Sequence, residues 1–95
     1  MLAEKPIDLS RLKGEQVDAQ VLRLAVIAEL DAISLYEQLA AVASSEEIKK
    51  VLLDVAKEEK THVGEFLEML LRVDKEQVEE LEKGREEIKE ILGEG

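Results

Sequence analysis

Glu59 and His62 are residues whose types and spacing could together bind a metal ion. Side chains three positions apart on a helix share a face, so a carboxylate oxygen and an imidazole nitrogen can converge on one ion. Glu-x-x-His is the arrangement of carboxylate-bridged di-iron bundles. By itself the pattern is weak in a chain so rich in glutamate, because a lone histidine is more often a satisfied core or surface residue.

Glu29 strengthens the metal interpretation, because it interrupts the apolar face of another predicted helix. Steps of four and three residues trace two seams of the coiled-coil kind, and neither seam contains a lysine or arginine. A buried carboxylate must be paired, protonated or bound to a cation, since an isolated buried charge is strongly unfavourable. The seams run through Leu22, Val26, Glu29, Ile33, Tyr36, Ala40 and Ala43, and through Leu52, Val55, Glu59, His62, Phe66, Met69 and Val73.

Counting the ligands predicts a dimer. A complete di-iron bundle takes a glutamate from each of two helices and a Glu-x-x-His from each of two more. This chain supplies one of each, which is half a site on half a four-helix bundle. A twofold homodimer would place two copies each of Glu29, Glu59 and His62 around a pair of metal ions, and twofold symmetry is the commonest association of identical chains.

Each of the other polar residues near the seams could have either a metal-related role or a purely structural one. The Tyr36 hydroxyl could reach toward the metal ligands, or the side chain could be a core aromatic with a solvated tip. Asp31, Glu58 and Glu65 lie beside the seams, where they could form an access path for cations or simply be solvated charges. The plain core of the second helix is predicted to contain Phe66, Leu67, Met69 and Leu70.

The elements that position these residues are predicted to be helical, so the fold class is all-α. Residues 1–14 have little periodicity and predict an N-terminal arm, followed by one helical domain over residues 15–95. Apolar residues recur at helical spacing over 15–43 and again over 45–72. Two long helices joined by so short a connection predict an antiparallel hairpin that completes a four-helix bundle by dimerisation.

Two capping patterns set the expected helix starts. Ser44 is predicted to cap the second helix, with Glu47 as its capping-box partner. Asp74, with Gln77 three residues later, predicts the start of a third helix ending near Leu92. That helix has only a narrow apolar seam and a weakening glycine in its middle, so we expect it to pack on a neighbour. The seam contains Val78, Leu81, Ile88 and Ile91, and the glycine is Gly84.

Charge and composition restrict the partners. The 95 residues carry a formal net charge of -10, which disfavours nucleic acid and favours cations. Cysteine is absent, which argues against a disulfide scaffold or thiolate metal site and for an intracellular protein. No signal peptide or membrane span is recognisable, so a cytoplasmic protein without membrane contact is expected.

Two long stretches of the chain resemble the encapsulated ferritins, ferritin-like proteins that work inside encapsulin nanocompartments. The stretches are LAVIAELDAISLYEQLA (24–40) and VLLDVAKEEKTHVGEFLEMLL (51–71). The order of Glu29, Tyr36 seven residues later, and then Glu-x-x-His followed by Val-Gly-Glu-Phe is far more specific than Glu-x-x-His alone. The resemblance reaches into the third predicted helix.

The resemblance implies a ferroxidase that oxidises Fe(II) with O2 and passes the product into the lumen of an encapsulin shell for storage. It implies a hairpin that dimerises around a shared di-iron centre, with dimers assembling into a ring, typically a decamer. Glu29, Glu59 and His62 match the family's iron ligands, and Tyr36 matches a tyrosine close to the centre. The native location would be the shell interior, within the cytoplasm.

This chain departs from the family pattern at one point, and other functions stay open. Some members carry two carboxylates that form a metal-access site; here Ala28 stands at the first position and Asp31 matches the second. Members are fused to the shell protein or carry a targeting extension, so the chain is expected to be trimmed or part of a longer polypeptide. The alternatives are a helical assembly fixed by Zn or Mn without turnover, and a structural dimer in which Glu59 and His62 set the register.

Overall fold

A computed structural model describes residues 13–95, which form three helices in chain order. They are α1 (Glu15–Val42), α2 (Glu46–Val73) and α3 (Lys75–Leu92). The described range contains no strand, which confirms the all-α class, and none of its helices is long and apolar enough to cross a membrane. The predicted N-terminal arm, residues 1–14, lies outside the described residues except for Lys13 and Gly14.

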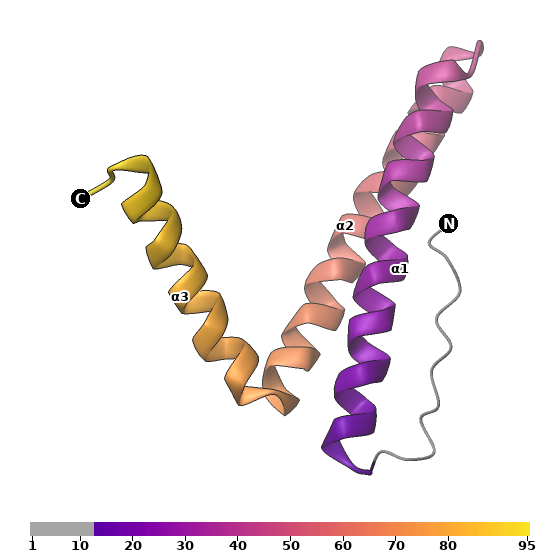
Figure 1. The fold of residues 1–95 in the computed structure, drawn as a ribbon. Helices are drawn as coiled ribbons and strands as arrows, with labels where there is room; N and C mark the ends of the chain where they lie inside the picture. Colours follow the sequence, from indigo (N-terminus) through magenta and orange to yellow (C-terminus); the bar gives the residue numbers. More distant parts are fainter. Residues whose placement is uncertain (1–12) are drawn as a thin grey trace.

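Helices α1 and α2 form the predicted antiparallel hairpin and lie side by side along their length (Figure 1). Each has 28 residues, which corresponds to about 42 Å at 1.5 Å per residue. Only residues 43–45 join them, and Ala43 has extended backbone that ends α1. The hairpin therefore places the middle of α1 beside the middle of α2, where the candidate ligands lie.

The start of α2 differs by one residue from the prediction. Ser45, and not Ser44, is the N-cap, and its hydroxyl oxygen accepts a hydrogen bond from the Ile48 amide at 3.3 Å. The cap must be the extended residue directly before the helix, because only there does the side-chain oxygen reach an unpaired amide of the first turn. Glu46 and Glu47 then fill the first turn, where negative charge is favoured by the helix dipole.

Asp74 forms the junction between α2 and α3. Its carboxylate accepts a hydrogen bond from the Gln77 amide at 3.1 Å, which confirms the predicted start of α3. The second carboxylate oxygen pairs with the Arg23 guanidinium of α1 at 2.6 Å. The Gln77 amide first, and then Arg23, hold the pKa of Asp74 below its usual value of 3.8. All three helices are thus tied together at this residue.

Helix α3 leaves the hairpin at the Asp74 junction and extends away from it, so that α2 and α3 form a V (Figure 1). It has no buried residue. Gly93 ends the helix with φ 69°, a left-handed conformation that suits glycine. Gly84 does not interrupt the helix. Helix α3 therefore adds no buried side chain to the core, and its packing on a neighbour stays a prediction.

The core of the hairpin is thin. In residues 13–95 the buried apolar side chains are Ala19, Ala40, Ala56 and Leu70. The remaining apolar seam residues are mostly half-buried, including Phe66 and Leu67, but Met69 is 47% exposed, so its assignment to the core of this chain is wrong. Seven residues after His62, Met69 shares the His62 side of α2 rather than the side that packs on α1. A second surface is needed to cover it.

Candidate metal centre

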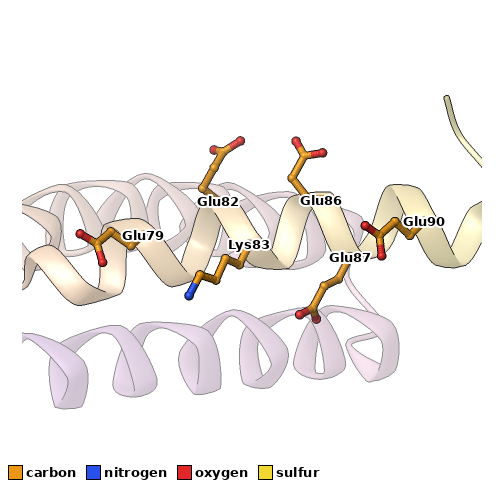
Figure 2. Close-up of a pocket in the computed structure, with 6 residues that line it drawn as sticks. All are labelled: Glu79, Glu82, Lys83, Glu86, Glu87 and Glu90. Carbon is orange, nitrogen blue, oxygen red and sulfur yellow. The ribbon is translucent and has the colours of Figure 1, made fainter.

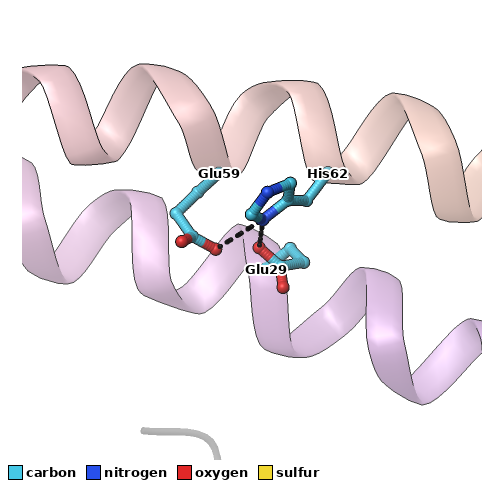
Figure 3. A group of neighbouring side chains, drawn as sticks. All are labelled: Glu29, Glu59 and His62. Carbon is cyan, nitrogen blue, oxygen red and sulfur yellow. Dashed lines mark hydrogen bonds and ion pairs between the residues drawn. The ribbon is translucent and has the colours of Figure 1, made fainter.

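Glu29, Glu59 and His62 meet between the two long helices. Figure 3 shows Glu29 on α1 turned toward Glu59 and His62, which project from neighbouring turns of α2. One potential ligand atom from each side chain can be chosen so that all three lie within 4.8 Å of one another. The antiparallel hairpin thereby unites residues that are 33 positions apart in sequence.

The imidazole of His62 is shared by the two carboxylates. His62 Nδ1 lies 3.2 Å from Glu29 Oε2 and 3.5 Å from Glu59 Oε2 (Figure 3). One ring nitrogen has a single proton or lone pair, so it cannot satisfy both carboxylates equally. An ion bound at about 2.0–2.2 Å from each ligand would need the ligand atoms about 3 Å apart, and His62 Nδ1 already lies 3.2 and 3.5 Å from the two carboxylate oxygens.

The electrostatics of the cluster favour a cation. The side chains of Glu29 and Glu59 are 19% and 18% exposed, whereas His62 is 41% exposed. Within residues 13–95, neither carboxylate is paired with a lysine or arginine. Two partly buried carboxylates therefore face one imidazole, which can offset at most one negative charge. A divalent ion would compensate both.

The cluster opens onto an apolar surface that we call the open face. Helical spacing places Val21, Ala25, Ala32 and Leu39 in a row along α1 next to the Glu29 side, and Val51, Val55, Phe66 and Met69 in a row along the His62 side of α2. Val51 is 63% exposed and Met69 is 47% exposed. An incomplete ligand set in the middle of an uncovered apolar surface is the arrangement expected of a site that a second subunit completes.

The α1 half of this face was not identified from the sequence seams. Its members repeat in steps of four and three from Val21 to Leu39, directly beside the seam that contains Glu29. The pattern was available in the sequence, but α1 is apolar on several sides, so periodicity alone did not distinguish its two stripes. The exposure of Val21, at 47%, and Leu39, at 41%, reveals the second stripe.

The remaining predicted residues lie outside the cluster. Tyr36 is half-buried on α1, seven residues or about 10 Å along the helix from Glu29. Asp31 lines a surface pocket with Ile27, Leu30 and Ser34, on the side of α1 away from Glu29. Within residues 13–95, Asp31 and the exposed Glu58 and Glu65 do not form a metal-binding group together. Their role in metal access stays a prediction.

The fold and the cluster define the class: this is an all-α, ferritin-like helical protein with a candidate carboxylate–histidine metal centre. The sequence model of the EncFtn-like family matches residues 4–91, and the chain belongs to that family. The fold agrees with the crystal structure of the encapsulated ferritin domain from Pyrococcus furiosus. The TM-score is 0.83 at 50% sequence identity, over 98% of this chain and 97% of that one.

Two curated relatives are longer proteins. The chain is 61% identical over 74 residues to the ferritin-like-encapsulin shell fusion protein of Pyrococcus furiosus, which covers 78% of this chain and 21% of the relative. It is 41% identical over 59 residues to the encapsulin nanocompartment cargo protein EncC of Myxococcus xanthus, covering 62% of this chain and 45% of the relative. The chain thus spans less than half the length of either.

Proposed function

We propose that this protein is a ferroxidase that oxidises Fe(II) with O2 at a di-iron centre shared by two copies of the chain. The observation that carries the proposal is the convergence of Glu29, Glu59 and His62 within 4.8 Å in the open face. Two such half-sites, facing each other across a twofold axis, would supply four carboxylates and two imidazoles, the ligand set of a di-iron bundle.

Each residue has a distinct part in the proposed reaction. The iron supplies the redox chemistry, in which each Fe(II) gives up one electron to O2. The carboxylates of Glu29 and Glu59 favour the harder Fe(III), whereas the neutral imidazole of His62 helps to hold Fe(II). Because each carboxylate has two oxygens, Glu29 and Glu59 could each contact more than one ion when the site is loaded. Tyr36, on the same helix as Glu29, is assigned as a further catalytic residue near the centre.

The proposed setting is an encapsulin nanocompartment in the cytoplasm. One relative is named as a fusion with the encapsulin shell and another as a cargo protein, which supports an association with a shell protein. Dimers would assemble into a ring, such as a decamer, and deliver oxidised iron to the lumen for storage. Storage is assigned to the lumen because the described hairpin has only a thin core, with four buried apolar side chains in residues 13–95.

Replacing Glu59 with alanine tests the proposed activity. We expect the initial rate of Fe(II) oxidation in air to fall by more than about 100-fold, because loss of an outer-sphere partner already costs about 10–100-fold at metal sites. The rate is followed by absorbance of Fe(III) and by O2 uptake. Asp54→Ala is the matched control, because Asp54 is an exposed carboxylate on the same helix outside the cluster. Wild-type rates in Glu59→Ala would reject the assignment.

The same assay distinguishes a ferroxidase from the main alternative function, a metal-fixed helical module without turnover. A helical module fixed by Zn or Mn would gain stability and mass on metal addition without consuming O2. Tight binding of Fe(II) with no stoichiometric O2 uptake in the wild-type chain would therefore favour that function over a ferroxidase.

A further inference from the structure

Helices α2 and α3 are separated by a single residue. Helix α2 ends at Val73 and α3 begins at Lys75, so only Asp74, with φ -133° and ψ 89°, lies outside both helices. The chain nevertheless changes direction there, and the two helices form a V (Figure 1). Backbone hydrogen bonds of helical spacing remain on both sides: the Asp74 amide donates to the Leu70 carbonyl at 2.9 Å, and the Val78 amide donates to the Asp74 carbonyl at 3.4 Å. The bend therefore interrupts the helical pattern over very few residues.

The local sequence does not account for this bend. Sharp kinks in helices occur mainly at proline or glycine, and residues 65–83 contain neither. Leucine, glutamate, lysine, arginine and glutamine, all of them favourable in helices, make up most of this segment. By local propensity alone, the segment is expected to form one continuous helix through Asp74.

The apolar pattern also continues through the joint. Leu70, Asp74 and Val78 follow one another in steps of four, so a continuous helix would place the apolar stripe of α3 in line with the side of α2 that packs on α1. In the bent arrangement Leu70 is 4% exposed, whereas Val78 and Ile88 of the α3 stripe are 45% and 53% exposed. The stripe of α3 consists of Val78, Leu81, Ile88 and Leu92.

The charged sides of the two helices would line up in the same way. Carboxylates surround a surface pocket on the side of α3 opposite its apolar stripe (Figure 2). The pocket is lined by Glu79, Glu82, Lys83, Glu86, Glu87 and Glu90. In a continuous helix this side would extend the exposed side of α2 that carries Asp54 and Arg72. Neither the apolar pattern nor the charge pattern therefore requires the bend.

Two interactions of the Asp74 carboxylate hold the bend. One oxygen accepts a hydrogen bond from the Gln77 amide at 3.1 Å, and the other pairs with Arg23 of α1 at 2.6 Å. The Gln77 amide has one proton, which in a continuous helix would go to the Val73 carbonyl, so the cap and the straight helix exclude each other. The Asp74 side chain is only 18% exposed, so its charge would be costly without Arg23. The bend thus depends on a contact that α1 supplies.

We infer that Asp74 and Arg23 form a charge lock, which selects the bent arrangement of α2 and α3 over one continuous helix of residues 46–92. Arg23 lies on α1, so the lock closes only when α1 is docked on α2. The same docking brings Glu29, about 9 Å further along α1, to the two α2 residues of the metal cluster. The direction of α3 is therefore coupled to the formation of the metal half-site within one chain.

Straightening would change the dimensions of the chain by a measurable amount. Residues 46–92 would extend about 70 Å as one helix, whereas the longest dimension of the bent molecule is 45 Å. Positions 57 and 90 would be about 50 Å apart in the straight helix and closer across the V. Lys57 and Glu90 are exposed and the natural chain has no cysteine, so spin labels can be attached to a Lys57→Cys, Glu90→Cys chain.

Distances between these labels, measured by electron paramagnetic resonance in metal-free protein, test the lock. The labelled chain is mixed with excess unlabelled chain, so that only distances within one molecule are recorded. Asp74→Ala removes both interactions and should move the main distance to about 50 Å. Arg23→Gln removes only the ion pair and should add a population at this distance, whereas Arg23→Lys keeps the charge and should retain the short distance.

Glu76→Ala is the matched control, because it removes an exposed carboxylate two residues after Asp74 and also introduces alanine; it should keep the short distance. Hydrogen exchange gives a second readout: residues 75–77 should exchange more slowly in Asp74→Ala, since their amides gain helical partners. Only the short distance in both Asp74→Ala and Arg23→Gln would overturn the inference. A long distance in Asp74→Ala alone would overturn the part of α1 in the lock. Because no iron is present, a failed ferroxidase assay and a failed lock give different results.

Discussion

At the scale of single residues, the three clustered side chains differ in exposure. His62 is 41% exposed, more than twice as much as Glu29 or Glu59. Its Nδ1 faces both carboxylates, which leaves Nε2 outside these contacts. The imidazole therefore lies at the border between the hairpin and the open face. A partner subunit is expected to change its surroundings most.

Asp74 both caps α3 and pairs with Arg23, and the Asp74→Asn variant distinguishes the contributions of these two interactions to stability. Asparagine caps helices as well as aspartate does, so the variant loses mainly the attraction to Arg23. Because the folded-state pKa is lowered, the charge stabilises the fold above the usual value of 3.8 and this contribution is lost as pH falls below it. We expect the variant to melt at a lower temperature than wild type at pH 7.

The pH dependence provides the control for this prediction. The difference in melting temperature between Asp74→Asn and wild type, followed by circular dichroism, should shrink when both are measured below pH 3.8. An equal difference at both pH values would show that the charge of Asp74 is not what stabilises the junction.

At the scale of helices, local sequence explains where α2 and α3 begin. Ser45 and Asp74 are polar residues that accept amide hydrogen bonds at the starts of α2 and α3. Two ion pairs then join α1 to the rest of the hairpin on either side of the metal cluster: Arg23 with Asp74 of the α2–α3 junction at 2.6 Å, and Glu37 with Lys60 of α2 at 3.3 Å. Periodicity predicted the helices, whereas these cross-helix pairs required the structure.

Two glycines of α3 should respond oppositely to alanine. A Cβ at Gly84 meets no atom within 4 Å, so Gly84→Ala should stabilise the helix by about 1 kcal/mol. Gly93 has φ 69°, so Gly93→Ala should cost about 1–2 kcal/mol. Both are measured by denaturant unfolding. Destabilisation by Gly84→Ala would mean that a neighbouring surface approaches this position closely.

At the scale of the whole molecule, the described part of one chain buries few large apolar side chains. Three of the four buried apolar residues in the described range are alanines, and large side chains such as Val51 and Met69 stay exposed. So little burial leaves the stability of a small chain dependent on association or metal binding. Assembly and metal binding are therefore expected to be coupled.

Met69→Glu tests this coupling, because it leaves all three ligands in place but puts a charge in the open face. Burying that charge should weaken dimerisation by at least about 100-fold, and Fe(II) oxidation should fall with it. Mass is measured by analytical ultracentrifugation with and without Fe(II). Gln38→Glu, an exposed position on the side of α1 away from Glu29, is the control and should behave as wild type. A dimeric, active Met69→Glu variant would place the dimer interface elsewhere.

The sequence by itself determined the helical class, the hairpin and the three candidate ligands, because helical periodicity, capping residues and the spacing of Glu59 and His62 are local properties. The placement of Ser45 as the cap was missed by one residue, since two adjacent serines give the same local pattern. Only the tertiary structure decided that Met69 lies outside the core, that α1 carries a second apolar stripe and that Arg23 holds Asp74. These depend on which side of each helix faces its neighbour, and that is set by the packing of segments far apart in the chain.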